Sequence, residues 1–167
     1  YKEIWESPEE RGGCMEELDE KKLWELAVAA REYSYSPYSG FKVGAALLSR
    51  GGKVFRGCNI ENAAYSPTNC AERSAFFSAI SQGERDFEAI AIAGGKDELI
   101  SCYPCGVCRQ VMAEFCDPCT FRIICGKSRE SLEVMTLDEL LPKGFKMQDC
   151  CLNPAFVIRL TLLELIF

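Results

Sequence analysis

The sequence predicts a single α/β domain of three layers, with helices on both faces of a sheet. Segments in which apolar residues recur at helical spacing alternate with short apolar runs that are typical of strands. An alternation of this kind favours helices packed against a buried sheet. The length of 167 residues, with 48% hydrophobic and 26% charged residues, fits one globular domain with a sizeable core.

The first half of the chain is predicted to hold a helix, a hairpin and a second helix. Residues 16–33 repeat apolar side chains along one helical face, namely Leu23, Leu26, Ala27 and Ala30. After the loop residues 34–40, strands are expected over 41–49 and 53–59, with a glycine-containing turn between them. A polar connection leads to a helix over 70–82, which ends before Gly83.

The second half continues the alternation. Residues 87–94 are a continuous apolar run, which is typical of a strand buried on both faces. We expect the later elements to be a helix over 105–116, strands over 121–126 and 132–136, and a helical turn over 138–141.

The two ends differ from the domain predicted over residues 16–145. Residues 1–15 form an acidic lead-in without an apolar stretch. Residues 146–167 form a C-terminal tail whose last part, 156–167, is strongly apolar. A membrane span needs about 20 apolar residues. We therefore favour a docked C-terminal helix or a subunit contact over a segment that lies at a membrane surface.

Composition excludes several classes of function. The formal net charge is −6, so neither a nucleic acid nor an anionic membrane is an expected partner. The chain contains no histidine, which excludes the Ser-His-Asp triad, the Cys-His dyad and every histidine-ligated metal site. Any metal must then be bound by cysteines and carboxylates.

Eleven cysteines are present, and several are closely spaced. The chain is long for a disulfide-stapled domain and shows no signal peptide, so we expect a cytoplasmic protein in a reducing compartment. In that compartment, closely spaced cysteines indicate a metal site more often than disulfides.

Three of these cysteines stand where two helices are predicted to begin. Cys70 precedes Ala71 and Glu72 at one helix start, and Cys105 and Cys108 follow Pro104 at the next. A helix N-terminus stabilises thiolates, and residues three apart lie on one face of its first turn. Both starts are expected at the edge beyond the strand C-termini, where open α/β sheets bind ligands. The pattern predicts one zinc ion on Cys70, Cys105 and Cys108, with the fourth position open as in catalytic sites.

Each part of this site has an alternative. Asn69 and Glu72 also have the spacing of a capping box, and Arg73 is either a partner of a thiolate or a surface residue. On an ideal helix, positions 70 and 72 do not share a face, so Cys70 must sit at the cap for Glu72 to reach the same site.

The cysteines also allow other pairings. Cys102 makes a second CxxC pair with Cys105. A closed structural zinc knuckle would use Cys105, Cys108, Cys116 and Cys119, although the predicted helix between the two pairs separates them by about a dozen ångströms. The remaining cysteines are interpreted as small buried apolar residues, namely Cys14, Cys58, Cys125, Cys150 and Cys151.

Several motifs together resemble one known family, the short zinc-dependent cytidine deaminases of pyrimidine salvage. The motifs are YSGFKVGAAL at 38–47, CNIENAAY at 58–65, CAER at 70–73, PCGVC at 104–108 and CRQV at 108–111. A first ligand, a Glu two residues later and then P-C-x-x-C form the signature of the wider zinc deaminase class. Cys70 in place of a histidine points to the branch that acts on free nucleosides. The resemblance covers about residues 16–145.

The resemblance implies a fold and an activity. The fold is an α/β/α sandwich with a five-stranded mixed sheet, usually in a homotetramer with shared active sites and one Zn²⁺ per subunit. The activity is hydrolytic deamination of cytidine, and of deoxycytidine, to the uridine nucleoside and ammonia. The alternatives are deamination of another aminopyrimidine nucleoside and a non-enzymatic protein with a structural zinc site.

The resemblance also implies roles for individual residues. Glu72 would move the protons, Asn59 and Glu61 would bind the ribose, and Phe41 would pack on the pyrimidine. Two further residues, Ala71 and Tyr65, would contact the substrate. Phe145 would reach a neighbouring subunit's base, and Arg73 and Gln110 would bond to the zinc thiolates. Tyr103 replaces the serine usual before Pro104, and residues 146–167 have no counterpart.

Overall fold

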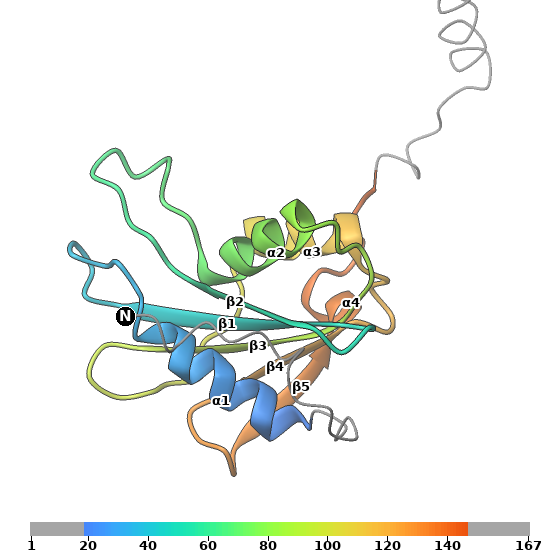
Figure 1. Ribbon diagram of the computed structural model, residues 1–167, viewed down its shortest axis with the longest axis horizontal. Helices are drawn as coiled ribbons and strands as arrows, with labels where there is room; N and C mark the ends of the chain where they lie inside the picture. Colours follow the sequence, from blue (N-terminus) through green and yellow to red (C-terminus); the bar gives the residue numbers. More distant parts are fainter. Residues whose placement is uncertain (1–18, 147–167) are drawn as a thin grey trace, which may run out of the picture.

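The computed structural model describes residues 19–146, which fold into three layers around a central sheet (Figure 1). The elements follow one another as α1 (Glu20–Arg31), β1 (Lys42–Ser49), β2 (Val54–Cys58), α2 (Ala71–Ser81), β3 (Phe87–Gly95), α3 (Gly106–Phe115), β4 (Arg122–Gly126), β5 (Leu132–Thr136) and α4 (Leu137–Leu140). Helix α1 lies on one face of the sheet, and α2 and α3 lie on the other. The predicted α/β/α sandwich is therefore confirmed.

The sheet is mixed, with strand order β2-β1-β3-β4-β5. Strand β1 pairs antiparallel with β2 and with β3, β3 pairs parallel with β4, and β4 pairs antiparallel with β5. Because β1 runs against both of its neighbours, β2 and β3 point the same way and end at the same edge. Helix α2 follows β2 and α3 follows β3, so both helices begin near that edge.

The core has one half on each face of the sheet. Side chains alternate along β1, so that Ala45 and Leu47 face α2 and α3 while Ala46 and Leu48 face α1. Burial on both faces explains why the central strands read as continuous apolar runs. Helix α1 lies directly on β1 at Gly44, where a Cβ atom would come within 2.0 Å of the Ala27 carbonyl oxygen. Only glycine fits there.

The element boundaries agree closely with the sequence prediction. Helix α1 begins after Asp19, whose side chain accepts a hydrogen bond from the backbone N–H of Lys22, and it ends two residues earlier than expected. The short strand over 132–136 and the helical turn before Pro142 are both present. The predicted acidic lead-in and nearly all of the predicted tail lie outside the described residues. Within residues 19–146, no helix has the length and hydrophobicity to cross a membrane.

Candidate active site

The starts of α2 and α3 bring three cysteines together. Cys70 is the N-cap residue of α2 and Cys105 is that of α3, both with extended backbone angles and without a side-chain capping bond. Cys108 follows in the first turn of α3 and is buried. Because capping does not occupy these side chains, all three sulfurs are available to a ligand at the two helix N-termini.

The distances between the sulfurs fit a metal site. Cys70 Sγ lies 3.9 Å from Cys105 Sγ, and Cys105 Sγ lies 3.5 Å from Cys108 Sγ. All three sulfurs lie within 4.8 Å of one another. Thiolates bound to one tetrahedral zinc ion at 2.3 Å stand about 3.8 Å apart. The donor chemistry and the spacing therefore both suit Zn²⁺, which is the cofactor of this site.

Electrostatics favour a negative charge on the sulfur cluster. A hydrogen bond from the Cys108 thiol, assisted by Arg73 and Cys105, lowers the pKa of Cys70 to about 5. The same hydrogen bond, together with burial, raises the pKa of Cys108. Arg73 Nη2 lies 3.7 Å from Cys70 Sγ and donates to the Thr68 carbonyl oxygen at 3.0 Å. Arg73 thus contacts the cluster and is not a free surface residue.

Glu72 is a buried carboxyl group beside the cysteines. It is the second residue of α2, and 4% of its surface is exposed. Burial raises its pKa to about 7, and the charge of Cys70 acts in the same direction. Hydrogen bonds from its own backbone N–H and from the Cys108 thiol oppose this shift. A buried carboxyl with such a pKa suits proton transfer at neutral pH.

Two alternative interpretations, the capping box at Asn69 and Glu72 and the closed zinc knuckle, are wrong. Helix α2 is capped by Cys70, so Glu72 is one residue short of the capping-box position, and the Asn69 amide donates instead to Ser74 Oγ. Cys105 and Cys116 cap opposite ends of α3, about 16 Å apart along the helix, which excludes the knuckle. Among residues 19–146, the only group of metal-ligating side chains is the predicted one.

Comparison with known proteins identifies the family. The model for the "Cytidine and deoxycytidylate deaminase zinc-binding region" matches residues 17–125.

The chain belongs to this cytidine deaminase family.

Its similarity to named cytidine deaminases extends over most of their length. One from Halalkalibacterium halodurans is 48% identical over 132 residues, covering 79% of this chain and 98% of that protein. One from Sporosarcina psychrophila is 47% identical over 132 residues, with coverage of 79% and 95%. The crystal structure of a cytidine deaminase from Burkholderia pseudomallei superposes with a TM-score of 0.68 at 49% identity, covering 74% of this chain and 96% of that one.

The residues that the resemblance to cytidine deaminases assigns to ribose follow β2. Asn59 Oδ1 accepts hydrogen bonds from the Val43 N–H at 2.8 Å and from Ser34 Oγ at 2.5 Å, and Nδ2 donates to the Phe41 carbonyl oxygen at 2.8 Å. Asn59 therefore ties the loop over 34–41 to β2.

Glu61 holds the same loop two residues later. Its Oε2 atom accepts from the N–H groups of Tyr38 and Ser39 at 2.8 and 3.2 Å. Hydrogen bonding with the Ser39 side chain, assisted by these N–H groups, lowers the pKa of Glu61. The carboxylate is therefore ionised at neutral pH and acts only as an acceptor.

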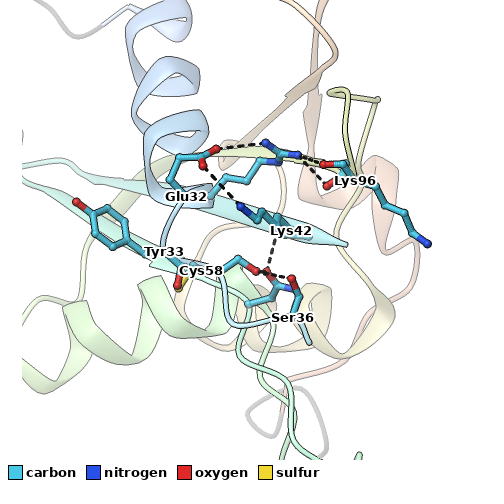
Figure 2. A network of polar contacts seen from close by, with 11 residues as sticks. Glu32, Tyr33, Ser36, Lys42, Cys58 and Lys96 are labelled. Atoms are coloured by element: carbon cyan, nitrogen blue, oxygen red, sulfur yellow. Dashed lines mark hydrogen bonds and ion pairs between the residues drawn. The ribbon is translucent and has the colours of Figure 1, made fainter. Parts of the chain in front are cut away.

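A network of polar contacts secures the end of α1 at this edge of the sheet (Figure 2). Lys42 Nζ lies 3.7 Å from Glu32 Oε2. The guanidinium of Arg31, which is almost fully buried, donates to the carbonyl oxygens of Gly95 and Lys96 at 3.0 and 2.6 Å. These contacts tie the end of α1 to the start of β1 and to the end of β3.

Phe41 lies where β1 meets the end of β3. A Cβ atom on Gly94 would come within 3.2 Å of the Phe41 ring and within 2.8 Å of Cys102 Sγ. Burial raises the pKa of Cys102 to about 11, and the charges of Glu72 and Cys70 add to the shift. Cys102 is thus a neutral thiol close to the site but outside the metal-binding group.

The other cysteines interpreted as buried are placed differently. Cys125 on β4 is fully buried, as predicted. Cys58 is only half-buried, and its thiol donates to the Tyr33 carbonyl oxygen at 3.3 Å. Predictions for Cys14, Cys150 and Cys151 fall outside the described residues.

The remaining residues implied by the resemblance are more dispersed. Ala71 is fully buried in the first turn of α2. Tyr65 is 79% exposed in a turn with φ of 57°, and Phe145 is 60% exposed. The Gln110 amide donates to the Phe145 carbonyl oxygen at 3.0 Å, so the expected bond to a cysteine is replaced by one to the end of the domain.

Two residues near the site were not assigned a contact by sequence reasoning. Tyr103 turns its hydroxyl toward β5, where it donates to Glu133 Oε2 at 2.8 Å. Ser34 binds the Asn59 amide from a loop 25 residues earlier. Nothing in the local sequence pairs either residue with its partner, because both contacts join distant segments.

Proposed function

We propose that this chain catalyses the hydrolytic deamination of cytidine, and of deoxycytidine, to the uridine nucleoside and ammonia. The observation that carries the proposal is the buried carboxyl of Glu72 beside three cysteine sulfurs that suit one zinc ion. Relatives that bear the name cytidine deaminase and are 47–48% identical support it.

The metal is assigned to Cys70, Cys105 and Cys108. A zinc ion bound by three protein ligands activates water and polarises the reacting centre. Arg73 contacts Cys70 Sγ and offsets part of the negative charge that three thiolates create.

Glu72 is assigned every proton transfer. The carboxylate takes a proton from the attacking water and delivers it to ring atom N3. It then takes the remaining proton of the oxygen added at C4 and passes it to the amino group, which leaves C4 as ammonia. With a pKa near 7, the same group serves as base and as acid. In a chain that contains no histidine, Glu72 is the titratable side chain placed to do so.

The sugar is assigned to Asn59 and Glu61. They stand two residues apart on an extended segment, so their side chains point to the same side. Phe41 supplies the apolar surface for the pyrimidine. An ionised carboxylate in the sugar site repels phosphate, so cytidine monophosphate is a poor substrate.

We further propose a homotetramer with shared active sites that acts in pyrimidine salvage in a reducing cytoplasm. Support comes from exposed apolar side chains on the helical face and loops, which include Phe77, Val107, Tyr65 and Phe145. The eight described cysteines are all free, as a reducing compartment requires.

The test is an ultraviolet assay of cytidine loss with purified protein, together with a zinc measurement and size-exclusion chromatography. We expect one zinc per chain, turnover that is lost on chelation and restored by zinc, and little turnover of cytidine monophosphate. Zinc-loaded protein that leaves cytidine unchanged would overturn the function.

A further inference from the structure

The side chain of Asn59 is almost fully used by its own chain. The amide oxygen has two acceptor positions, which are filled by the Val43 N–H and by the Ser34 hydroxyl. One N–H of Nδ2 donates to the Phe41 carbonyl oxygen. Among the described residues, the other N–H has no hydrogen-bond partner. Asn59 therefore offers a ligand one donor and no acceptor.

Glu61 has the opposite polarity. Its Oε2 atom accepts from two backbone N–H groups, and the Ser39 side chain also hydrogen-bonds with the carboxylate. These three donors leave one of the roughly four acceptor positions of a carboxylate for a ligand. Since the carboxylate is an acceptor only, the pair presents one donor and one acceptor. A sugar hydroxyl matches both, because it accepts from Asn59 with its oxygen and donates its hydrogen to Glu61.

We propose that Ser34 is a positioning residue for sugar recognition, because its hydroxyl blocks the second acceptor position of the Asn59 amide oxygen. The proposal rests on the proposed function, in which Asn59 and Glu61 bind the nucleoside sugar. The backbone groups of Phe41 and Val43 already determine which way the amide faces. Ser34 determines whether that amide is a donor alone or a donor and an acceptor.

The direction of the serine hydrogen bonds follows from atom counting. Asn59 Oδ1 only accepts, so the single hydroxyl hydrogen of Ser34 is directed to it. Ser34 Oγ also lies 3.2 Å from the hydroxyl oxygen of Ser36, which is labelled in Figure 2, but the contact with Asn59 is shorter, at 2.5 Å, and takes the one hydrogen. The backbone N–H of Ser34 donates to the Arg31 carbonyl oxygen at 3.1 Å, which fixes the serine at the end of α1.

Removing the hydroxyl opens an acceptor position on the amide oxygen. Water or a wrongly oriented sugar hydroxyl then donates to it, and the donor-acceptor match with the substrate weakens. A hydroxyl donated to the amide oxygen also polarises the amide and strengthens its remaining N–H as a donor. Loss of Ser34 should therefore reduce the preference for substrates that carry sugar hydroxyls, and it should act on KM more than on kcat.

The experiment compares Ser34→Ala and Ser34→Thr with the wild type on cytidine and on 2′,3′-dideoxycytidine. For Ser34→Ala, we expect kcat/KM for cytidine to fall about three- to tenfold, through KM, as for one neutral hydrogen bond. The dideoxy substrate lacks the hydroxyls and should be affected less than twofold. Ser34→Thr keeps a hydroxyl and should restore the ratio of the two kcat/KM values.

The matched control is Ser81→Ala, which removes an exposed serine hydrogen bond on α2, far from the sugar site in sequence, and should leave the ratio unchanged. An equal loss on both substrates, or no loss on cytidine, would overturn the role of Ser34 while leaving the proposed function intact. Wild-type protein that deaminates neither substrate would overturn the proposed function, and the inference with it.

Discussion

The cysteine site (Cys70, Glu72, Cys105 and Cys108) and the proposed sugar site (Asn59, Glu61 and the loop over 34–41) are built in different ways. The cysteine site stands on two helix starts, and its cysteines are not used as capping side chains. In the proposed sugar site, the side chains of Asn59 and Glu61 themselves hold the loop through hydrogen bonds to backbone groups. The side chains assigned to chemistry in the cysteine site are therefore not needed to cap its helices. In the proposed sugar site, the same side chains are assigned to binding and also hold the loop in place.

The largest effect is expected for Cys105→Ala. Loss of one of three thiolates should release the zinc and abolish turnover, a larger loss than the roughly 10²–10⁴-fold expected for a general acid–base residue. Zinc content and cytidine turnover measure it. The control is Cys119→Ala, which lies beyond the other end of α3 and should keep both. Equal zinc loss in the two variants would contradict the assigned ligands.

Next in size is Glu72→Gln. The amide keeps the shape of the side chain but transfers no proton, so turnover should fall about 10²–10⁴-fold. Zinc content and the melting temperature should stay close to wild type, since burying a neutral amide does not add charge. Glu114→Gln, on the exposed face of α3, is the control. Turnover within tenfold of wild type would remove Glu72 from the mechanism.

Asn59→Ala should disturb binding and folding together. The change leaves the Val43 N–H and the Phe41 carbonyl without their partners, which costs about 1–3 kcal/mol of unfolding free energy. We expect a lower denaturation midpoint as well as at least a tenfold lower kcat/KM for cytidine. Asn62→Ala, in an exposed turn, should change neither. Weaker binding with unchanged stability would show that Asn59 does not stabilise the loop, and the difference drawn between the two sites would then be wrong.

Of these four variants, the smallest effect is expected for Glu61→Gln, which should change binding without changing stability. The glutamine oxygen still accepts from the N–H groups of Tyr38 and Ser39, so the loop and the zinc content should be unchanged. The other carboxylate oxygen becomes an amide nitrogen, which cannot accept from a sugar hydroxyl. We expect kcat/KM for cytidine to fall about ten- to a hundredfold, mainly through KM. An unchanged KM would place the sugar elsewhere.

The fold and the metal-binding cysteines could be predicted from the sequence because both depend on local patterns. Alternating apolar segments place strands and helices, and a Pro-Cys-x-x-Cys start orients two sulfurs within one helical turn. Sequence reasoning left the role of the Asn69–Glu72 spacing open, because a cap at residue 69 and one at residue 70 differ by a single position. Only the structure shows that Cys70 caps α2.

The long-range contacts of the Asn59 and Gln110 side chains could not be predicted in the same way. Asn59 meets Ser34 across 25 residues, and Gln110 meets Phe145 across 35. An isolated Asn or Gln has the same donors and acceptors wherever it stands, so its partners depend on which loops pack beside it.

The sequence by itself determined the order of helices and strands, the cysteines at two helix starts and the absence of histidine, since each depends on residues that are near neighbours or on composition. The tertiary structure decided that Cys70 and Cys105 meet at 3.9 Å, that Glu72 is buried, and that Asn59 is left with one free donor. The physical reason is the separation of the interacting residues along the sequence. Hydrogen bonds within a turn depend on near neighbours, whereas the burial of a side chain and its hydrogen-bond partners are determined only when the sheet brings distant segments to one edge.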